Sequence, residues 1–486
     1  MIDKRASGVL MHISSLFGEY SCGAFSDAAK YFIDFLADCG FSYWQVLPFC
    51  MVDECNSPYK SYSTFGGNPY FVDLDTLHRK GLLTREELDG ARQQTPYSCE
   101  FVRLYHTRFD LLRKAAERVD EKTRETVERF VADDPYLDAF CRFMSLKTVN
   151  GEKPWYAWKT QEGDAQTLFL WKFIQYEFFT QWDAIRAYAA KKGVRIIGDI
   201  PIYVALDSCD VYSNKELFCL DRDNKPTCVA GVPPDYFAQD GQLWGNPLYD
   251  WDKMRADGFR WWRDRLAHAL RLFDGVRIDH FRGLEAYWAV PGGAKTAREG
   301  KWMPGPGMEL VEKLRETAGD ALIIAEDLGD MTESAIRLVR ESGFPGMRVF
   351  QFAFLDGADN PHLPHNYTHN CVAYSGTHDN NTLLGYLWEM DDASRRRMLE
   401  YCGYTSGDWT GGCPAVLRAI FASHAGLVIF PIQDLLGYGS DTRLNIPGKA
   451  DGNWQYRVTK DQLDSIDRTS LRRMNALYQR ENKNKE

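Results

Sequence analysis

The sequence of 486 residues predicts an α/β fold, a single (β/α)8 TIM barrel with a long helical insertion and a long loop insertion between its strands. Two observations support this prediction. Short apolar runs, each about the length of a buried parallel strand, recur along the chain, and amphipathic stretches that close on a glycine precede several of them. Eight strands favour a closed barrel, whereas six or seven would also fit an open, doubly wound sheet.

The eight apolar runs are the expected strands. In chain order they span residues 8–13, 43–48, 194–204, 275–279, 321–327, 346–352, 371–379 and 426–434. The helical stretches before four of them end at Gly40, Gly193, Gly319 and Gly343. A glycine suits the left-handed position that follows a helix, so these four residues predict helix ends.

Two long stretches interrupt the alternation of strands and helices. Residues 74–190 are rich in Glu, Arg, Tyr and Phe at helical spacing, which predicts a mainly helical insertion. Residues 205–251 are dense in Gly, Pro and aromatic residues, which predicts a loop over the active site, since long loops inside compact domains are usually functional. We expect residues 1–486 to form one catalytic domain.

The composition disfavours several classes of partner and site. The net charge is −10 and no long Lys/Arg-rich run occurs, which disfavours nucleic acid and anionic membranes. Neither a secretion signal nor an apolar stretch long enough to span a membrane is visible. The twelve cysteines lack CxxC pairs, so we expect reduced thiols in a cytoplasmic protein. A zinc site at Cys209, Cys219 and Cys228 is disfavoured by their wide spacing and the lack of a nearby His.

Acidic residues follow several expected strands, where a barrel has its catalytic mouth. They are Asp199, Asp279, Glu326, Asp327 and Asp379. A single such residue is usually a helix cap or an ion-pair partner, but acidic residues at four strand ends favour a catalytic cluster. Two carboxylates that flank a bond are what the cleavage of a glycosidic bond requires.

Asp279 and Glu326 are the expected pair. Arg277 shares a strand face with Asp279, so it either forms a structural ion pair or favours the ionised carboxylate that a nucleophile needs. Glu326 follows apolar residues and lies beside Asp327, and both features favour a carboxyl that keeps its proton for an acid/base role. Because side-chain direction is ambiguous at a strand end, the choice between Glu326 and Asp327 stays open.

Aromatic residues are frequent in the loops, including Tyr59, Tyr236, Phe237, Trp244 and Trp288. Each of them alone is compatible with partly buried packing. Sugar rings, however, present C–H faces that stack on aromatic planes, while Asn, Asp, His and Arg bind hydroxyl groups. The combination indicates a carbohydrate substrate.

Seven segments resemble the 4-α-glucanotransferases, also called amylomaltases or disproportionating enzymes, which are relatives of the α-amylases. They are NSPYKSYSTFGGNPYFVDL, IIGDIPIYVALDS, GVPPDYFAQDGQLWGNPLYDW, GVRIDHFRGLEAYW, AEDLG, GTHDNNT and RLNIPG, and they extend through nearly the whole chain. The third is highly specific, whereas AEDLG alone would be weak. The resemblance implies a retaining enzyme that moves α-1,4-glucan segments through a covalent glycosyl-enzyme to the 4-hydroxyl of another glucan or of glucose. No metal, nucleotide or organic cofactor is implied.

The resemblance also implies roles for individual residues. Asp279 looks like the nucleophile, Glu326 like the acid/base, and Asp379 like the third acidic residue, which holds hydroxyls of the sugar in the cleavage subsite. Trp244 looks like the aromatic lid over the acceptor side, with Tyr236 and Phe237 in the same loop. Further substrate contacts are implied for Tyr59, Asp199, Arg277, His378 and Asn445.

Two segments depart from the family pattern. Asn381 stands where many relatives have an acidic residue, and the first strand carries His12 and Ser14 where relatives are usually more apolar and contain proline. Without a starch-binding module or a transit peptide, the chain resembles the short bacterial type. Two alternatives remain, an α-glucan hydrolase of the same superfamily and a non-catalytic glucan-binding protein.

Overall fold

The computed structural model describes residues 2–53, 55–234, 239–449 and 451–482. Within these ranges, eight parallel strands close into a barrel in the order β1-β12-β11-β10-β9-β6-β3-β2. They are β1 (Ala6–Leu10), β2 (Tyr43–Gln45), β3 (Arg195–Ile200), β6 (Gly275–Ile278), β9 (Leu322–Ala325), β10 (Gly346–Val349), β11 (Cys371–Tyr374) and β12 (Leu427–Pro431). Each overlaps one of the eight predicted runs, so the predicted barrel is confirmed and the open sheet is excluded.

The barrel strands are apolar along their length because both of their faces are buried. In β12, for example, Val428, Ile429 and Phe430 are all inaccessible to solvent. Gly198 in β3 marks a close approach, because a Cβ atom there would lie 2.1 Å from the ring of Phe273. The missing side chain lets that ring pack directly against the strand that carries Asp199.

Helices join the strands and cover the barrel. They include α1 (Asp27–Cys39), α10 (Arg260–Leu272), α11 (Met308–Ala318), α12 (Glu333–Ser342), α13 (Leu383–Glu389), α14 (Asp392–Tyr401), α15 (Cys413–Ala422), α16 (Ile432–Leu436), α17 (Lys460–Asp464) and α18 (Arg468–Leu477). Gly40 and Gly343 are left-handed helix ends, as predicted, and Gly193 also has positive φ. Gly319 also ends its helix, as predicted, but its φ of 55° and ψ of −121° lie outside the left-handed helical region.

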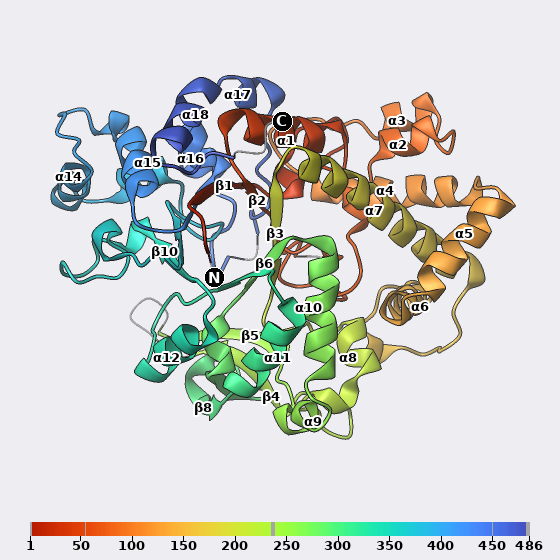
Figure 1. Ribbon diagram of the computed structural model, residues 1–486. Helices are drawn as coiled ribbons and strands as arrows, with labels where there is room; N and C mark the ends of the chain where they lie inside the picture. Colours follow the sequence, from red (N-terminus) through yellow and green to blue (C-terminus); the bar gives the residue numbers. More distant parts are fainter. Residues whose placement is uncertain (1, 54, 235–238, 450, 483–486) are drawn as a thin grey trace.

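Residues between β2 and β3 form a group of helices at one side of the barrel (Figure 1). They are α2 (Leu74–Arg79), α3 (Arg85–Gly90), α4 (Phe101–Glu117), α5 (Glu121–Ala132), α6 (Pro135–Val149) and α7 (Ala165–Lys191). The long helix α7 contacts α4, α5, α6 and the barrel strand β3. Its aromatic residues, such as Phe173, Phe178 and Trp182, are therefore buried packing residues.

The prediction of a loop for residues 205–251 is wrong. This segment contains α8 (Cys209–Ser213), β4 (Cys228–Val232) and β5 (Gln242–Pro247), and α9 (Trp251–Ala256) begins at its end. The strands β4 and β5 join β7 (Ala286–Pro291) and β8 (Lys301–Pro304) in an antiparallel sheet of order β5-β4-β7-β8. Gly231 explains the error: it lies at a register shift between β4 and β5, and a Cβ atom there would lie 2.6 Å from the carbonyl oxygen of Gln242. A glycine that lets two strands approach closely therefore looks, in the sequence, like a loop residue.

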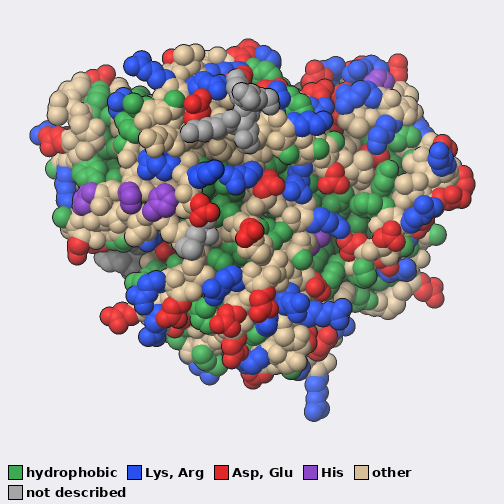
Figure 2. Space-filling model, viewed as in Figure 1, with side chains coloured by type: hydrophobic (Ala, Val, Ile, Leu, Met, Phe, Trp, Pro, Cys, Tyr) green, Lys and Arg blue, Asp and Glu red, His purple; other side chains and the backbone are tan. Residues whose placement is uncertain are grey.

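The surface carries both signs of charge. On the face shown in Figure 2, Lys and Arg side chains alternate with Asp and Glu, and neither sign gathers into one large area. Among the described residues, no helix combines the length and apolar character that a membrane crossing requires.

A buried arginine, Arg480, forms hydrogen bonds at the place where the first and last strands of the barrel pair. β1 pairs with β12 from Ala6, opposite Leu427, onward. The guanidinium of Arg480 is inaccessible to solvent and donates hydrogen bonds to the carbonyl oxygens of Ala6, Phe421, Ser423, Ala425 and Gly426. Burial lowers the pKa of Arg480 to about 9.

We predict that Arg480→Leu lowers the free energy of unfolding by about 3 kcal/mol, because buried carbonyl oxygens lose their donor. Urea unfolding at pH 7 followed by circular dichroism measures the change. The control is Arg473→Leu on the exposed side of α18, which should cost less than about 0.5 kcal/mol. Equal losses in the two variants would show that the Arg480 contacts do not fasten the barrel.

Candidate active site

The predicted acidic residues meet at one end of the barrel. Asp199 lies at the end of β3, Asp279 directly follows β6 and Glu326 directly follows β9. These three strands are neighbours in the order β3-β6-β9. Asp379 lies in the loop that follows β11, at the same carboxyl ends of the strands, where the active sites of such barrels are found.

Arg277 bridges two of these carboxylates. Its Nη1 lies 2.7 Å from Oδ2 of Asp199, and its Nη2 lies 2.7 Å from Oδ1 of Asp279. The side chain is only 4% exposed, and the two carboxylates raise the pKa of Arg277 above its usual value although burial opposes this. The expected ion pair is therefore confirmed, and the guanidinium of Arg277 contacts Asp279 as well as Asp199.

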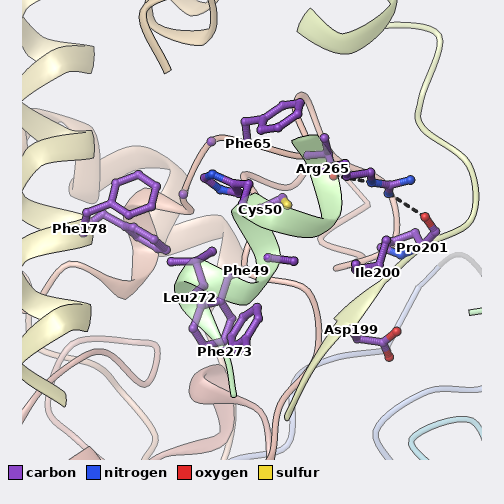
Figure 3. Close-up of a pocket in the computed structure, with 16 residues that line it drawn as sticks. Phe49, Cys50, Phe65, Phe178, Asp199, Ile200, Pro201, Arg265, Leu272 and Phe273 are labelled. Atoms are coloured by element: carbon purple, nitrogen blue, oxygen red, sulfur yellow. Dashed lines mark hydrogen bonds between the residues drawn. The ribbon is translucent and has the colours of Figure 1, made fainter. Parts of the chain in front are cut away.

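Asp199 is enclosed by apolar packing behind the barrel mouth. A small cavity of about 30 Å³ lies there, with Phe178 and Phe273 on one side and Asp199 and Pro201 on the other (Figure 3). Burial raises the pKa of Asp199, while Arg277 lowers it. The hydroxyl of Tyr59 donates a hydrogen bond of 2.8 Å to Oδ2 of Asp199, so Asp199 links Tyr59 to Arg277.

Glu326 lies in a different environment, held by backbone groups. Its Oε2 accepts a hydrogen bond of 2.6 Å from the backbone N–H of His280, and its Oε1 accepts one of 2.8 Å from that of Leu328. Burial raises the pKa of Glu326 to about 7; Arg277 and the two backbone donors oppose this shift, and the charge of Asp279 adds to it. Glu326 is thus a carboxyl suited to keep its proton near neutral pH.

The structure separates Glu326 from its neighbour Asp327. Oδ1 of Asp327 accepts a hydrogen bond of 2.6 Å from the backbone N–H of Met347, and Oδ2 pairs with Arg348 at 3.1 Å. Asp327 is therefore bound at the next strand, β10, whereas Glu326 contacts the residue that follows Asp279. This geometry favours Glu326 over Asp327 for chemistry at the mouth.

Asp379 is oriented by residues from two segments. The side-chain amide of Asn445 donates a hydrogen bond of 2.6 Å to Oδ1 of Asp379, and Nε2 of His378 lies 3.4 Å from Oδ2. Burial lowers the pKa of His378, so its ring is neutral at pH 7. This ring stacks on Tyr59, with centroids 5.1 Å apart and planes inclined by 14°. Asp379, His378, Asn445 and Tyr59 thus form one connected group.

Trp244 joins the site from the antiparallel sheet. It lies on β5, its ring is 37% exposed, and it meets the ring of His280 edge-on at 5.0 Å. Tyr236 and Phe237, predicted as further contacts, lie outside the described residues. Trp288 belongs to β7, where its indole N–H donates to the carbonyl oxygen of Ala297 at 2.8 Å, so it is a packing residue of the sheet.

Three residues at the site were missed by the sequence analysis. His280 has left-handed backbone angles, φ 47° and ψ 48°, which are rare outside glycine, and its N–H contacts Glu326. Arg443 donates to the backbone carbonyl of Asp379 at 2.6 Å, and the ring of Trp454 lies 6.0 Å from that of Tyr59. The sequence motifs RIDHFRG and RLNIPG contain His280 and Arg443. The order of residues in a motif, however, does not show which groups the backbone N–H of His280 and the guanidinium of Arg443 contact.

The two departures from the family pattern have structural partners. The amide of Asn381 donates to Oε1 of Glu389 at 2.7 Å and to the hydroxyl of Ser440 at 2.9 Å. Nδ1 of His12 accepts a hydrogen bond of 3.2 Å from the backbone N–H of Leu47. Both residues therefore support the loops around the mouth.

Among the described residues, no group of three or more His, Cys, Asp or Glu side chains is arranged to hold a metal ion. Cys209 is buried, whereas Cys219 and Cys228 are half-buried.

Comparisons with known proteins agree on one family. The model of the family described as 4-alpha-glucanotransferase matches residues 11–463. The 4-alpha-glucanotransferase of Clostridium butyricum is 41% identical over 487 residues, covering 97% of this chain and 100% of that protein. The one of Thermus thermophilus is 40% identical over 489 residues, covering 97% and 98%. The solved structure of amylomaltase from Streptococcus agalactiae in complex with acarbose is 36% identical, with a TM-score of 0.94, and the match covers 98% of this chain and 100% of that one.

We predict that Glu326→Gln makes the stability of the protein less dependent on pH. The pKa of Glu326 is about 7 in the folded protein and near 4.5 when unfolded, so the native state binds this proton more tightly. Stability from Glu326 is therefore fully present below pH 4.5 and is lost as the pH rises through 7. Between pH 5 and pH 8 the parent should lose about 1 to 3 kcal/mol more than the variant.

Urea unfolding at both pH values measures this difference. The control is Glu341→Gln, which removes an exposed carboxyl. Its stability should change with pH as that of the parent does. If Glu326→Gln also lost as much stability between pH 5 and pH 8 as the parent, the carboxyl of Glu326 would not hold a tightly bound proton.

Proposed function

This chain belongs to the 4-α-glucanotransferase family, and we propose that it transfers α-1,4-glucan segments from a donor glucan to the 4-hydroxyl of another glucan or of glucose, with Asp279 and Glu326 as its reacting groups. One observation carries this assignment of roles. Two carboxyl groups on neighbouring strands have opposite environments, since Asp279 contacts a guanidinium and Glu326 is buried with a raised pKa. This is the arrangement that retaining glycosidic chemistry requires.

The reaction has two steps with the same two carboxyl groups. Asp279 attacks the anomeric carbon of the donor while Glu326 gives its proton to the departing glycosidic oxygen, which leaves a glycosyl ester on Asp279. In the second step Glu326 takes the proton from the 4-hydroxyl of the acceptor, which attacks the ester and releases Asp279. Two inversions at the same carbon give net retention.

The change of role of Glu326 follows from the charge of its neighbour. The ionised form of Asp279 contributes to the raised pKa of Glu326. Glu326 has by then given its proton to the departing oxygen, and once Asp279 is esterified this contribution disappears, so the pKa of Glu326 falls and its carboxylate stays ionised. It is then ionised when the acceptor arrives, as a general base must be.

The connected group around Asp379 supports binding of the donor sugar. Asp379 presents carboxylate oxygens, and Asn445 and His378 add neutral polar groups beside it. Such groups suit the hydroxyls of a sugar ring at the cleavage position. Stacking of His378 on Tyr59 fixes both rings, so the hydroxyl groups of the substrate meet a rigid surface.

We propose that Trp244 selects a sugar acceptor over water. Water is present at roughly 55 M, so a dilute acceptor competes only if it is bound and oriented beside the glycosyl-enzyme. The exposed ring of Trp244 packs against His280, the residue after Asp279, and offers an apolar face next to the reacting carbon. A hydrolase of the same superfamily does not need such a contact, and a non-catalytic glucan binder does not need a proton donor beside a carboxylate.

We further propose that the chain works as one catalytic domain in the cytoplasm. The cysteines of the described residues are free thiols, which agrees with a reducing compartment.

We predict that the protein converts maltotriose to glucose and longer maltooligosaccharides without a rise in total reducing ends. Asp279→Asn and Glu326→Gln should each lower turnover by about three or more orders of magnitude, because both groups act in the chemical step. Asp327→Asn is the matched control, and its turnover should remain within about tenfold of the parent since Asp327 is bound at β10. A steady rise in reducing ends would instead identify a hydrolase, and binding without conversion a glucan-binding protein.

The two catalytic variants should differ with a glycosyl fluoride as donor. Fluoride leaves with little help from an acid, so Glu326→Gln should accumulate a glycosyl ester on Asp279, which mass spectrometry of peptides detects. Donor consumption without a modified Asp279 peptide would contradict the assignment of Asp279 as nucleophile.

We predict that Trp244→Ala raises the ratio of hydrolysis to transfer by about threefold to tenfold, the loss expected for one aromatic contact. Single-turnover formation of the glycosyl-enzyme should change much less. The control is Trp302→Ala, which removes an indole of similar exposure, 41%, from β8 at the opposite edge of the same sheet. If Trp244→Ala slowed both reactions equally, the residue would serve the donor site or the fold.

A further inference from the structure

A groove of about 730 Å³ runs along the active site. Its lining includes Tyr59, Asp279 and Trp244 from the site described above. It also includes Pro154 and Tyr156, which belong to the segment between α6 and α7 in the helical insertion. A volume of this size is within the range of protein sites that bind ligands. The groove therefore connects the reacting carboxylate with a distant part of the chain.

The groove lies on the acceptor side of the reacting bond. Trp244, proposed above as the acceptor contact, is among its lining residues, together with its neighbours Gly245 and Asn246. Of the group that supports the donor sugar, Tyr59 borders the groove at its inner end, whereas His378, Asp379 and Asn445 are not among the described residues that line it. A glucan chain in this groove would thus extend from the acceptor position outward.

The segment that carries Tyr156 is firmly attached to the loop that follows β3. Trp155 is buried; its backbone N–H donates to Oδ1 of Asp207 at 3.1 Å, and its indole N–H donates to the carbonyl oxygen of Leu206 at 2.7 Å. The buried ammonium of Lys147 pairs with the other oxygen of Asp207 at 2.6 Å. These contacts fix the position of the next residue, Tyr156, relative to the barrel.

Tyr156 itself stays open to solvent. The residue is 53% exposed although its neighbour Trp155 is buried, and the two rings meet edge-on with centroids 5.6 Å apart. A large aromatic ring on a fixed backbone, facing a groove that leads to the reacting carbon, offers a preorganised flat surface. The C–H faces of a glucosyl unit are a surface of matching chemistry, and Glu152 in the same lining provides an acceptor for its hydroxyls.

We infer that Tyr156 stacks on an outer glucosyl unit of the acceptor, so that the helical insertion determines how strongly the enzyme prefers long acceptors over glucose. This inference rests on the proposed function and goes beyond it, because it names a residue outside the barrel mouth that sets acceptor length. Glucose fills only the position beside Trp244. A longer maltooligosaccharide also reaches Tyr156 and gains the second contact.

The test measures transfer from one fixed glycosyl fluoride to glucose, maltose and each maltooligosaccharide up to maltoheptaose. Tyr156→Ala should raise the KM for the longer acceptors by about threefold to tenfold, the worth of one aromatic contact. The KM for glucose, the kcat and the formation of the glycosyl-enzyme should stay unchanged. Tyr156→Phe, which keeps the ring, should behave like the parent.

Tyr97→Ala is the matched control, since Tyr97 is exposed to 59% and is not among the residues that line the groove. It should leave all acceptor KM values unchanged. The inference is overturned if Tyr156→Ala leaves the KM of every acceptor up to maltoheptaose unchanged. It is also overturned if the KM of glucose rises by the same factor as those of longer acceptors, or if only the KM of the donor rises.

A binding measurement separates this inference from the proposed function. Calorimetry with maltoheptaose compares Asp279→Asn with the double variant Asp279→Asn/Tyr156→Ala, so no turnover is needed. Weaker binding in the double variant supports stacking at Tyr156, and equal binding overturns it. If the parent only hydrolyses maltotriose and forms no longer maltooligosaccharides, the proposed transfer fails whatever the binding experiment shows.

Discussion

The site depends on one buried guanidinium shared by two carboxylates. Removing three charged groups from water costs several kcal/mol for each, and only short, well-aligned contacts offset that cost. Arg277 meets this condition with 2.7 Å contacts to both Asp199 and Asp279. Since Asp199 and Arg277 are register partners on β3 and β6, the ion pair also fixes the two strands against each other. The orientation of Asp279 thus follows from the same contacts that hold the barrel mouth together.

The same arrangement gives two chemically similar side chains opposite properties. Asp279 lies against the shared cation and its side chain is 29% exposed, whereas Glu326 is buried and accepts hydrogen bonds from two neutral backbone donors. One donor is the N–H of His280, whose left-handed conformation directs it toward Glu326. The residue after the proposed nucleophile therefore holds the proposed acid, so the geometry of the two groups is coupled through a single peptide unit.

The sequence predicted the features that follow from burial and from the spacing of apolar residues. It did not predict the features that follow from contacts between residues far apart in the chain. The eight strands were predictable because burial of both faces leaves continuous apolar runs, and the acidic residues were predictable because they directly follow those runs. The antiparallel sheet was not predictable, since Gly231 at a register shift resembles a loop residue. Neither the choice of Glu326 over Asp327 nor the roles of Arg443 and Trp454 follow from local pattern, because each depends on residues from another strand or loop. The roles of the site residues, Tyr236 and Phe237 included, remain predictions.

The closure of the barrel has a consequence for how the chain is made. Strand β1 pairs early in the chain with β2, but its other neighbour is β12, and the contact that closes this side joins Ala6 to Arg480, 474 residues further along. At 5 to 20 residues per second, a ribosome needs roughly 25 to 95 s to synthesise that distance. During this time the first strand has one open edge, which is a site for wrong pairing with other chains. Native closure is therefore a late, long-range event that waits for the synthesis of Arg480, and a topology with contacts this distant in sequence folds slowly.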